Sequence, residues 1–281
     1  MRIGYLGPEG TFSHEALRAL GVGAPDGDDR LVELASVHAT VMAVHEGEVD
    51  RALVPIENSL EGSINATLDA LAAETEEVVI VGEVVHPVHH CLVVREPIAL
   101  ERIRTVASHP QANAQCARFL RTELGRARVL PAASTADAVR ALAEGGRAQA
   151  ALGTRLAAEL YGGQVLRAGV EDDPENETRF VWIARRESPP PDGAAPWKTS
   201  VVFWGPGAEA PGWLVRCLSE LAFRGVNLTR IESRPRRQGL GRYMFFLDLD
   251  GRDTDVPVTA ALEAISGQVE RLRVLGSYPA A

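Results

Sequence analysis

Short runs of apolar residues alternate with segments of helical periodicity over the first part of the chain. The runs are rich in Val, Ile, Leu and Ala, which is typical of strands buried on both faces of a parallel sheet. This alternation predicts an α/β fold with helices covering the sheet. An apolar stripe predicts a helix over residues 63–73, with Ser63 as its N-cap. The predicted strands are residues 3–6, 52–56, 78–81, 105–107 and 150–152.

One pattern occurs twice, over residues 36–55 and 134–153. Each copy begins with serine, continues as a helix ending in Glu-Gly, and turns into an apolar strand. The repetition predicts two similar α/β lobes with a cleft between them, which is the two-lobed, periplasmic-binding-protein-like arrangement. The alternative is that any two helix-turn-strand segments look this similar, in which case the repetition carries no information about two lobes.

A proline-rich linker is predicted at residues 187–197, where four prolines exclude a helix or a central strand. The chain after it has the order strand, helix, strand, strand, helix, strand, which is the βαββαβ order of a ferredoxin-like α+β domain. The sequence therefore predicts one domain over residues 1–186 and a second over residues 198–281. The C-terminal elements are expected at residues 199–204, 212–224, 227–234, 243–250, 257–266 and 271–275.

Composition excludes several classes of protein. The formal net charge is −9, which argues against a nucleic-acid binder, and the basic stretch at residues 234–242 is interpreted as a solvated hairpin edge. Cys91, Cys116 and Cys217 form no paired framework, so a reducing, cytoplasmic location is expected. No apolar run is long enough to span a membrane. The single lysine, Lys198, excludes Schiff-base chemistry before it.

No metal or cofactor is expected from the motifs. The stretch at residues 86–91 contains His86, His89, His90 and Cys91, which leaves a zinc site as an alternative. Its flanks are strand-like and no second ligand pair has fitting spacing, so a strand or hinge histidine group is preferred. The signatures HExxH, CxxC, GxSxG and GxGxxG are missing.

Five polar turns follow predicted strands or begin predicted helices. Ligands of open parallel sheets bind beyond the carboxyl ends of the strands, so these turns are expected to share a rim. Each turn alone also fits a helix cap or a plain loop. Together they predict a pocket of neutral hydrogen-bond donors with one arginine. Their polar residues are Thr11, Ser13, Glu57, Asn58, Ser59, Ser108, Gln115, Thr154, Thr178 and Arg179.

These turns, taken together, resemble the prephenate dehydratase family. The sequences GPEGTFS, VPIENSLEG, SHPQANAQC and NETRF occur in the family's order over residues 1–185, and GVNLTRIESRP resembles the phenylalanine-binding ACT domain that follows in that family. No chorismate mutase segment precedes Met1, so the chain resembles the monofunctional form.

The resemblance implies a cofactor-free reaction in which prephenate loses water and carbon dioxide to give phenylpyruvate. It implies that Thr178 assists departure of the ring hydroxyl, with Asn58 and Gln115 as further catalytic or orienting groups. Arg179 would position a substrate carboxylate. The remaining substrate-binding residues would be Thr11, Ser13, Glu57, Ser59, Ser108 and Thr154.

The resemblance also implies feedback control by L-phenylalanine and a homo-oligomer, either dimer or tetramer. Trp213 stands where the family's effector loop usually has alanine, and its bulk is expected beside the effector. The effector-binding residues would be Gly212, Trp213, Leu214, Glu232, Ser233, Arg234 and Pro235. Two alternatives stay open: arogenate dehydratase activity, and a non-catalytic amino-acid sensor.

Overall fold

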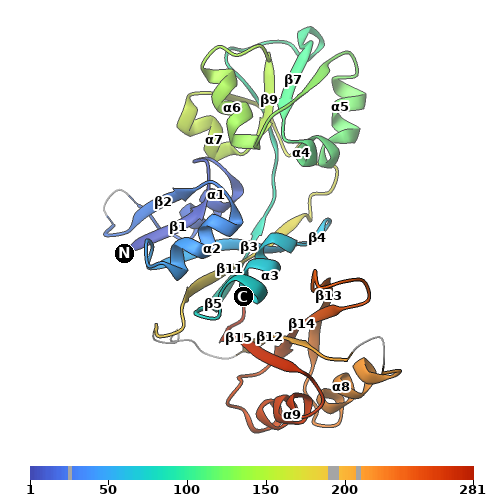
Figure 1. The fold of residues 1–281 in the computed structure, drawn as a ribbon. Helices are drawn as coiled ribbons and strands as arrows, with labels where there is room; N and C mark the ends of the chain where they lie inside the picture. Colours follow the sequence, from blue (N-terminus) through green and yellow to red (C-terminus); the bar gives the residue numbers. More distant parts are fainter. Residues whose placement is uncertain (25–26, 189–195, 207–209) are drawn as a thin grey trace. The chain divides into compact units, whose positions relative to one another are not determined.

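The computed structural model describes residues 1–24, 27–188, 196–206 and 210–281 (Figure 1). Most of the predicted linker lies outside these residues. The chain forms two compact units. Unit 1 comprises Met1–Ile64 and Val85–Phe180, and unit 2 comprises Asn65–Val84 and Val181–Ala281. The domain boundaries expected from sequence remain predictions, since the units follow tertiary contacts and assign Asn65–Val84 to the C-terminal residues.

The first sheet has the strand order β2-β1-β3-β11-β5, with the short strand β4 beside β3. The strands β1, β2 and β3 are parallel, which confirms the predicted α/β fold. The helices α1 (Phe12–Ala19) and α2 (Val37–His45) pack on β1 and β3. The strand bounds are β1 Arg2–Leu6, β2 Arg30–Leu34, β3 Arg51–Asn58, β4 Gly62–Ser63, β5 Val78–Pro87 and β11 Glu177–Arg185.

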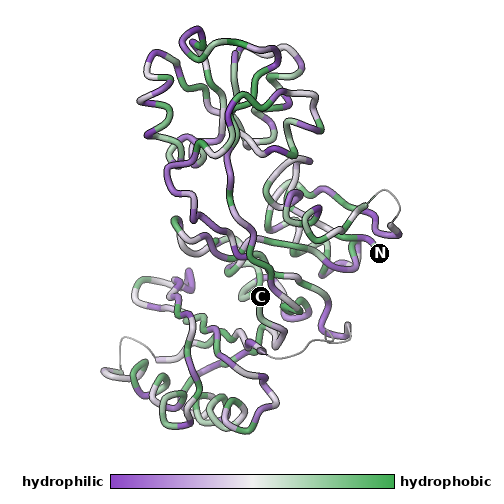
Figure 2. The backbone as a smooth tube through the Cα atoms, turned by 180° about the vertical axis from the view of Figure 1, so that it is seen from behind, coloured by the Kyte–Doolittle hydropathy of each residue, from purple (hydrophilic) through white to green (hydrophobic). Residues whose placement is uncertain are grey.

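The second sheet lies wholly in unit 1 and has the order β10-β6-β9-β7-β8. Its central strands β6, β7 and β9 are almost wholly buried, and Figure 2 shows hydrophobic stretches alternating with hydrophilic turns along the chain. The strands are β6 Cys91–Val94, β7 Thr105–Ser108, β8 Arg128–Pro131, β9 Ala150–Gly153 and β10 Gln164–Ala168. The helices are the 3-10 turn Leu100–Arg102, α4 Pro110–Gln115, α5 Ala117–Glu123, α6 Thr135–Ala143 and α7 Arg155–Tyr161.

The internal repeat is borne out by the structure. Its two helices are α2 and α6, which lead into β3 and β9 of the two sheets. Ser36 accepts a hydrogen bond from the N–H of Ala39, and Ser134 accepts one from the N–H of Asp137. Both helices end before a left-handed glycine, since Gly47 has φ 73° and Gly145 has φ 87°. The same local code therefore builds one helix beside each sheet.

Unit 2 contains an antiparallel sheet of order β13-β14-β12-β15 with two helices, in the predicted βαββαβ order. Its core combines Phe203, Trp213 and Leu247 with apolar residues of both helices. The bounds are β12 Trp197–Trp204, α8 Trp213–Ala222, β13 Leu228–Pro235, β14 Tyr243–Asp250, α9 Val256–Ser266 and β15 Arg271–Pro279.

Unit 2 also includes the segment Asn65–Val84, which the sequence analysis counted with the first domain. This segment comprises α3 (Asn65–Asp69), a π-helix (Ala70–Glu74) and the first residues of β5. The prediction of Ser63 as helix N-cap is wrong. Ser63 lies in β4, where it pairs with Glu57 in an antiparallel ladder, so the helix starts two residues later.

Among the residues that the structure describes, no helix is long and apolar enough to cross a bilayer.

Candidate active site

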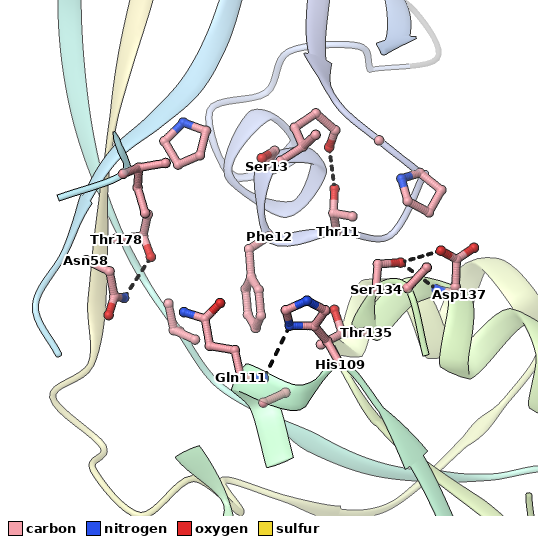
Figure 3. Close-up of a pocket in the computed structure, with 18 of the residues that line it drawn as sticks. Thr11, Phe12, Ser13, Asn58, His109, Gln111, Ser134, Thr135, Asp137 and Thr178 are labelled. Atoms are coloured by element: carbon pink, nitrogen blue, oxygen red, sulfur yellow. Dashed lines mark hydrogen bonds between the residues drawn. The ribbon is translucent and has the colours of Figure 1, made fainter. Parts of the chain in front are cut away.

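A cavity of about 490 Å³ lies in unit 1 and is lined from both of its sheets (Figure 3). One side comes from the turn after β1, the start of α1, the end of β3 and the start of β11. The other comes from α4 and the start of α6. The residues that line it most prominently with polar groups are Thr11, Ser13, Asn58, His90, His109, Gln111, Gln115, Ser134, Thr135, Asp137 and Thr178.

The structure brings the three residues proposed for catalysis to this one cavity. Thr178, Asn58 and Gln115 all line it, although they lie far apart in sequence. Thr11 and Ser13, from the turn at the start of α1, line it as well. Half of the ten residues expected at the rim are therefore in the cavity wall.

The amide of Asn58 has a fixed orientation. Its Oδ1 accepts hydrogen bonds from the backbone N–H groups of Leu60 and Glu61, at 3.1 and 3.0 Å. A backbone N–H can only donate, so the oxygen must face these groups. The Nδ2 amino group consequently faces Asn176 Oδ1 at 2.8 Å and Thr178 Oγ1 at 3.1 Å. Asn58 is 4% exposed, which keeps water from competing for these contacts.

This orientation determines the role of the Thr178 hydroxyl. Because Asn58 donates to Oγ1, the hydroxyl oxygen acts as an acceptor toward Asn58, and its own hydrogen remains available for a group in the cavity. Figure 3 shows the two side chains meeting at one side of the cavity. Asn58 is thus suited to orient Thr178, and Thr178 is suited to donate a hydrogen bond to a ligand.

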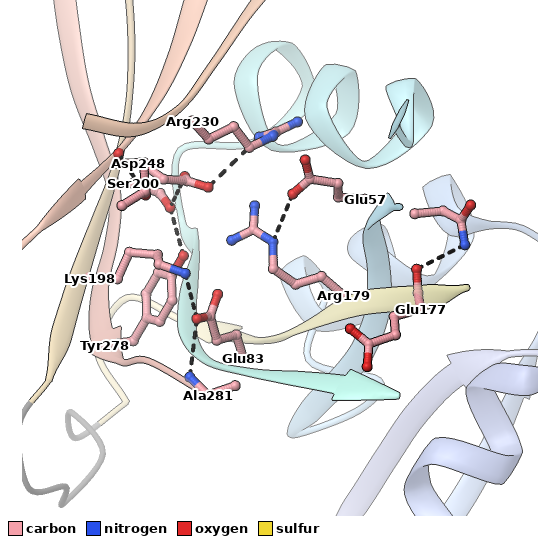
Figure 4. A network of polar contacts seen from close by, with 12 residues as sticks. Glu57, Glu83, Glu177, Arg179, Lys198, Ser200, Arg230, Asp248, Tyr278 and Ala281 are labelled. Atoms are coloured by element: carbon pink, nitrogen blue, oxygen red, sulfur yellow. Dashed lines mark hydrogen bonds and ion pairs between the residues drawn. The ribbon is translucent and has the colours of Figure 1, made fainter. Parts of the chain in front are cut away.

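Arg179 and Glu57 are not among the residues that line the cavity. Arg179 Nε lies 3.1 Å from Glu57 Oε2, and the pair is seen in Figure 4. Successive side chains of a strand point to opposite faces of a sheet, so Arg179 cannot share the direction of Thr178. The expectation of a substrate contact through Arg179 stays a prediction, and one contact of its guanidinium is with Glu57.

Ser59, Ser108 and Thr154 are also outside the cavity lining, and each has an internal partner. The Ser59 hydroxyl accepts from the N–H of Glu177 at 3.0 Å. The Ser108 hydroxyl donates to the carbonyl of Leu152 at 2.8 Å. The Thr154 hydroxyl caps α7 and donates to the carbonyl of Gly10 at 2.7 Å, which ties the turn after β1 to α7.

Several residues in or next to the cavity wall were not singled out as ligands from the sequence. Asn176 does not line the cavity, but its Oδ1 accepts a hydrogen bond from Asn58 at 2.8 Å, and it is 1% exposed. Ser134 and Asp137 form the start of α6, which the internal repeat had already marked as a helix start. His109 is the N-cap of α4. His90 belongs to the histidine group considered for zinc, and burial lowers its pKa.

The cavity wall contains no arginine or lysine among the described residues. Its donors are hydroxyls, amides, imidazoles and backbone N–H groups. The side chain of Thr11, at the N-cap of α1, bonds to the carbonyl of Leu6 and does not cap the helix. The first turn of α1 therefore presents N–H groups with a partial positive charge near the cavity. Within the described part of the chain, no cluster of His, Cys, Asp and Glu has the arrangement of a metal site.

The residues expected to bind an effector lie in unit 2. Gly212 is the N-cap of α8 with φ 75°, and Leu214 packs against the core. Trp213 is 4% exposed, donates through Nε1 to the carbonyl of Gln268 at 2.7 Å, and packs against Phe203. Its indole is thus part of the core, in contrast to the bulk beside an effector that the sequence suggested.

The second group expected to bind an effector is Glu232, Ser233, Arg234 and Pro235, at the end of the edge strand β13. Ser233 and Pro235 are exposed. Arg234 makes a two-point contact with Asp69 of α3, with Nε at 3.2 Å from Oδ1 and Nη2 at 2.9 Å from Oδ2. This motif therefore connects the sheet of unit 2 to the segment Asn65–Val84.

The α/β fold and a cavity with neutral donors around an oriented hydroxyl fit an enzyme that acts on a small polar substrate. The family model described as prephenate dehydratase matches residues 3–188. A prephenate dehydratase of Mycolicibacterium vanbaalenii is 45% identical over 99% of this chain and 90% of its own length. The chain belongs to the prephenate dehydratase family.

Two solved structures are similar to this chain over nearly its whole length. The prephenate dehydratase of Arthrobacter aurescens, in complex with L-Phe, has a TM-score of 0.89 and 36% identity, covering 99% of this chain and 90% of that one. GqqA, described as a quorum quenching acylase, has a TM-score of 0.86 and 32% identity, covering 100% of this chain and 98% of its own.

Proposed function

We propose that this protein converts prephenate to phenylpyruvate, water and carbon dioxide in the cavity of unit 1. The observation that carries the proposal is the orientation of Thr178. Backbone N–H groups fix Asn58, Asn58 donates to Thr178, and the Thr178 hydrogen is left for the substrate. A hydroxyl leaving group needs such a donor as negative charge develops on its oxygen.

The reaction balances without an oxidant or a cofactor. The C–C bond to the ring carboxylate breaks, its electron pair enters the ring, and the C–O bond at the opposite ring carbon breaks as the ring becomes aromatic. The departing oxygen takes a proton to become water, and carbon dioxide leaves. Thr178 donates a hydrogen bond to the departing oxygen. The proton that converts this oxygen to water is replaced from solvent.

Neutral donors are proposed to hold the two carboxylates of the substrate. The first turn of α1, the amide of Gln115 and the hydroxyl of Ser13 border the cavity and are the groups proposed for this purpose. Arg179 is proposed to act at a distance, by pairing with Glu57 and so fixing the end of β3 next to β11. The described cavity lining has no arginine or lysine. This favours release of carbon dioxide, because a full positive charge would stabilise the ring carboxylate, which must lose its negative charge to leave.

We further propose that the two sheets of unit 1 form periplasmic-binding-protein-like lobes, and that residues 198–281 form an ACT domain that binds L-phenylalanine. The βαββαβ order of unit 2 supports the second point, as does the L-Phe complex of the Arthrobacter aurescens relative. A homo-oligomer, either dimer or tetramer, is proposed from the family resemblance. Light scattering of the purified protein tests the oligomer.

The proposed activity is tested with purified protein and prephenate in a buffer free of metal and nucleotide. Phenylpyruvate absorbance should rise, and Thr178→Val, which keeps the side-chain shape, should lower kcat by about 10²–10⁴. Arogenate is offered in parallel, and L-phenylalanine is titrated in as inhibitor. The acylase described for one relative requires a further arm with an N-acylated amino acid. Amide cleavage in place of phenylpyruvate formation, or an unchanged Thr178→Val variant, contradicts the proposal.

A further inference from the structure

His90 is a buried histidine in the cavity wall with no role so far. It precedes β6, is 1% exposed, and lines the cavity together with Gln115. Its ring stands edge-on to Phe12, with centroids 5.3 Å apart and planes at 89°. Two backbone contacts hold it in place: its N–H donates to Glu171 Oε2 at 2.8 Å, and its carbonyl accepts from the N–H of Val170 at 3.1 Å.

The two ring nitrogens of His90 have different surroundings. Nε2 lies 3.0 Å from Gln115 Oε1. Nδ1 is buried and has no hydrogen-bond partner among the residues that the structure describes. Burial also lowers the pKa of His90, which keeps the ring neutral near pH 7, so one nitrogen carries a hydrogen and the other does not.

Only one placement of that hydrogen satisfies the site. A hydrogen on Nδ1 would be a buried donor without an acceptor, which is the costlier kind of unpaired group. It would also leave the Nε2 lone pair facing the Gln115 side chain, which would then have to turn its amino group toward His90. A hydrogen on Nε2 donates to Gln115 Oε1 and leaves only a bare lone pair at Nδ1.

We propose that His90 is a positioning residue that holds Gln115 with its amino group toward the cavity. His90 donates from Nε2 to Gln115 Oε1, so both amide hydrogens of Gln115 are directed at the substrate. Gln115 then donates both amide hydrogens from a fixed position. His90 orients Gln115 as Asn58 orients Thr178. The effect on catalysis rests on the proposed function, whereas the position of the hydrogen does not.

The hydrogen position is measured directly by ¹⁵N NMR of protein with labelled histidine, in which the His90 signals are assigned from those missing in His90→Phe. The expected result is a protonated Nε2 and an unprotonated Nδ1 at neutral pH. A protonated Nδ1 overturns the proposal whether or not the protein turns over prephenate. If the protein proves inactive while Nε2 carries the hydrogen, the proposed function fails and the tautomer assignment stands.

The catalytic effect is measured with two substitutions at the same site. His90→Phe keeps a flat ring against Phe12 and removes the donor, and kcat should fall about 5- to 30-fold, the effect of one lost hydrogen bond, with KM changed less. His90→Gln retains a donor near the position of Nε2 and should recover most of this loss. His38→Phe, at an exposed position of α2, is the matched control and should leave kcat unchanged.

A double-mutant cycle separates positioning from a merely structural role. If His90 acts through Gln115, then His90→Phe should add little to the loss already caused by Gln115→Met. Additive losses in kcat, or a His90→Gln variant as slow as His90→Phe, overturn the proposal. Circular dichroism melting of each variant identifies any that fail to fold, and the NMR result stands apart from them.

Discussion

At the scale of the residue, the site depends on hydrogen bonds whose direction is set by groups that can only donate. The N–H groups of Leu60 and Glu61 orient Asn58, and the N–H of Gly10 orients His14 by donating to its Nδ1 at 3.1 Å. Neighbouring residues of a strand have opposite directions, so Thr178 lines the cavity and Arg179 does not. The alternation of side chains along a strand can be applied to the sequence alone. It argues against Thr178 and Arg179 both contacting one substrate.

Asn58→Asp tests the donor role at this scale. Aspartate keeps an oxygen for the N–H groups of Leu60 and Glu61 but cannot donate to Thr178, whose hydrogen would then turn toward the carboxylate. We expect kcat to fall about 10²–10³-fold, as for loss of one donor in an active site. Asn65→Asp, at the exposed start of α3, is the control and should be as active as the wild type. Equal activity of the two variants would show that Thr178 needs no orienting amide.

His14 makes stability depend on pH. Burial lowers its pKa below the unfolded value near 6.5, so at lower pH the unfolded chain binds a proton that the folded chain does not. The free energy of unfolding should therefore be constant above about pH 7 and should fall as the pH drops through 6.5. Urea titrations at several pH values measure it. His14→Asn keeps an acceptor for Gly10 and should reduce this slope, with the remainder coming from His90, whose pKa burial also lowers; an unchanged slope would exclude a contribution from His14.

At the scale of the element, the turn between β1 and α1 brings the two sheets of unit 1 together. Gly10 has φ 84°, and a Cβ there would lie 2.9 Å from Cα of Ala157 in α7. The Thr154 hydroxyl bonds to the Gly10 carbonyl at the same place. Gly10 has no side chain, and this lets α1 approach α7 closely. The width of the cavity depends on this spacing.

Gly10→Ala should therefore lose stability for two reasons, the left-handed backbone conformation and the clash with Ala157. Gly21→Ala has only the first of these and serves as the comparison. Gly21 has φ 75° but nothing within 4 Å of its would-be Cβ, so its substitution carries only the left-handed backbone cost of about 1–2 kcal/mol. Gly10→Ala should lose more stability than this in urea unfolding, and kcat/KM should fall only for Gly10→Ala. Similar kinetics for both variants would mean that the close approach to α7 does not matter to the cavity.

At the scale of the whole molecule, unit 2 is assembled from two distant stretches of chain. Lys198 of β12 lies 2.6 Å from Glu83 of β5, and their side chains are only 16% and 2% exposed (Figure 4). Arg234 and Arg237 both reach Asp69, and Arg271 reaches Glu76. The basic hairpin that the sequence suggested to be a solvated edge thus supplies ion pairs within unit 2.

The single lysine gives a clean test of this assembly. Lys198→Met removes the cation that lies 2.6 Å from the buried Glu83 carboxylate, and should cost about 3–5 kcal/mol in urea unfolding. Replacing both partners in Lys198→Met/Glu83→Met should recover much of that loss, because the buried carboxylate is removed together with its cation. If Lys198→Met alone is as stable as the wild type, water must solvate the Glu83 carboxylate, which contradicts the prediction.

Truncation tests the boundary expected from sequence. A chain ending at residue 186 retains Asn65–Val84 but lacks the sheet that completes unit 2. We expect it to bind the dye ANS and to melt without cooperativity, because apolar surface of this segment is left uncovered. A cooperative melt with prephenate turnover would instead support the independent domain of residues 1–186.

Local pattern was sufficient for the α/β and βαββαβ order, the repeated helix-turn-strand unit and the motifs of the family, but it missed strands such as β2, β8 and β10 and misplaced the helix start at Ser63. Strand alternation, serine caps and terminal glycines act between residues close in sequence, so the sequence alone determines them. Tertiary structure decided that Arg179 pairs with Glu57, that Trp213 enters the core, that His90 meets Gln115, and that Asn65–Val84 joins unit 2. These are contacts between distant segments, and they exist only once the sheets have brought their ends together.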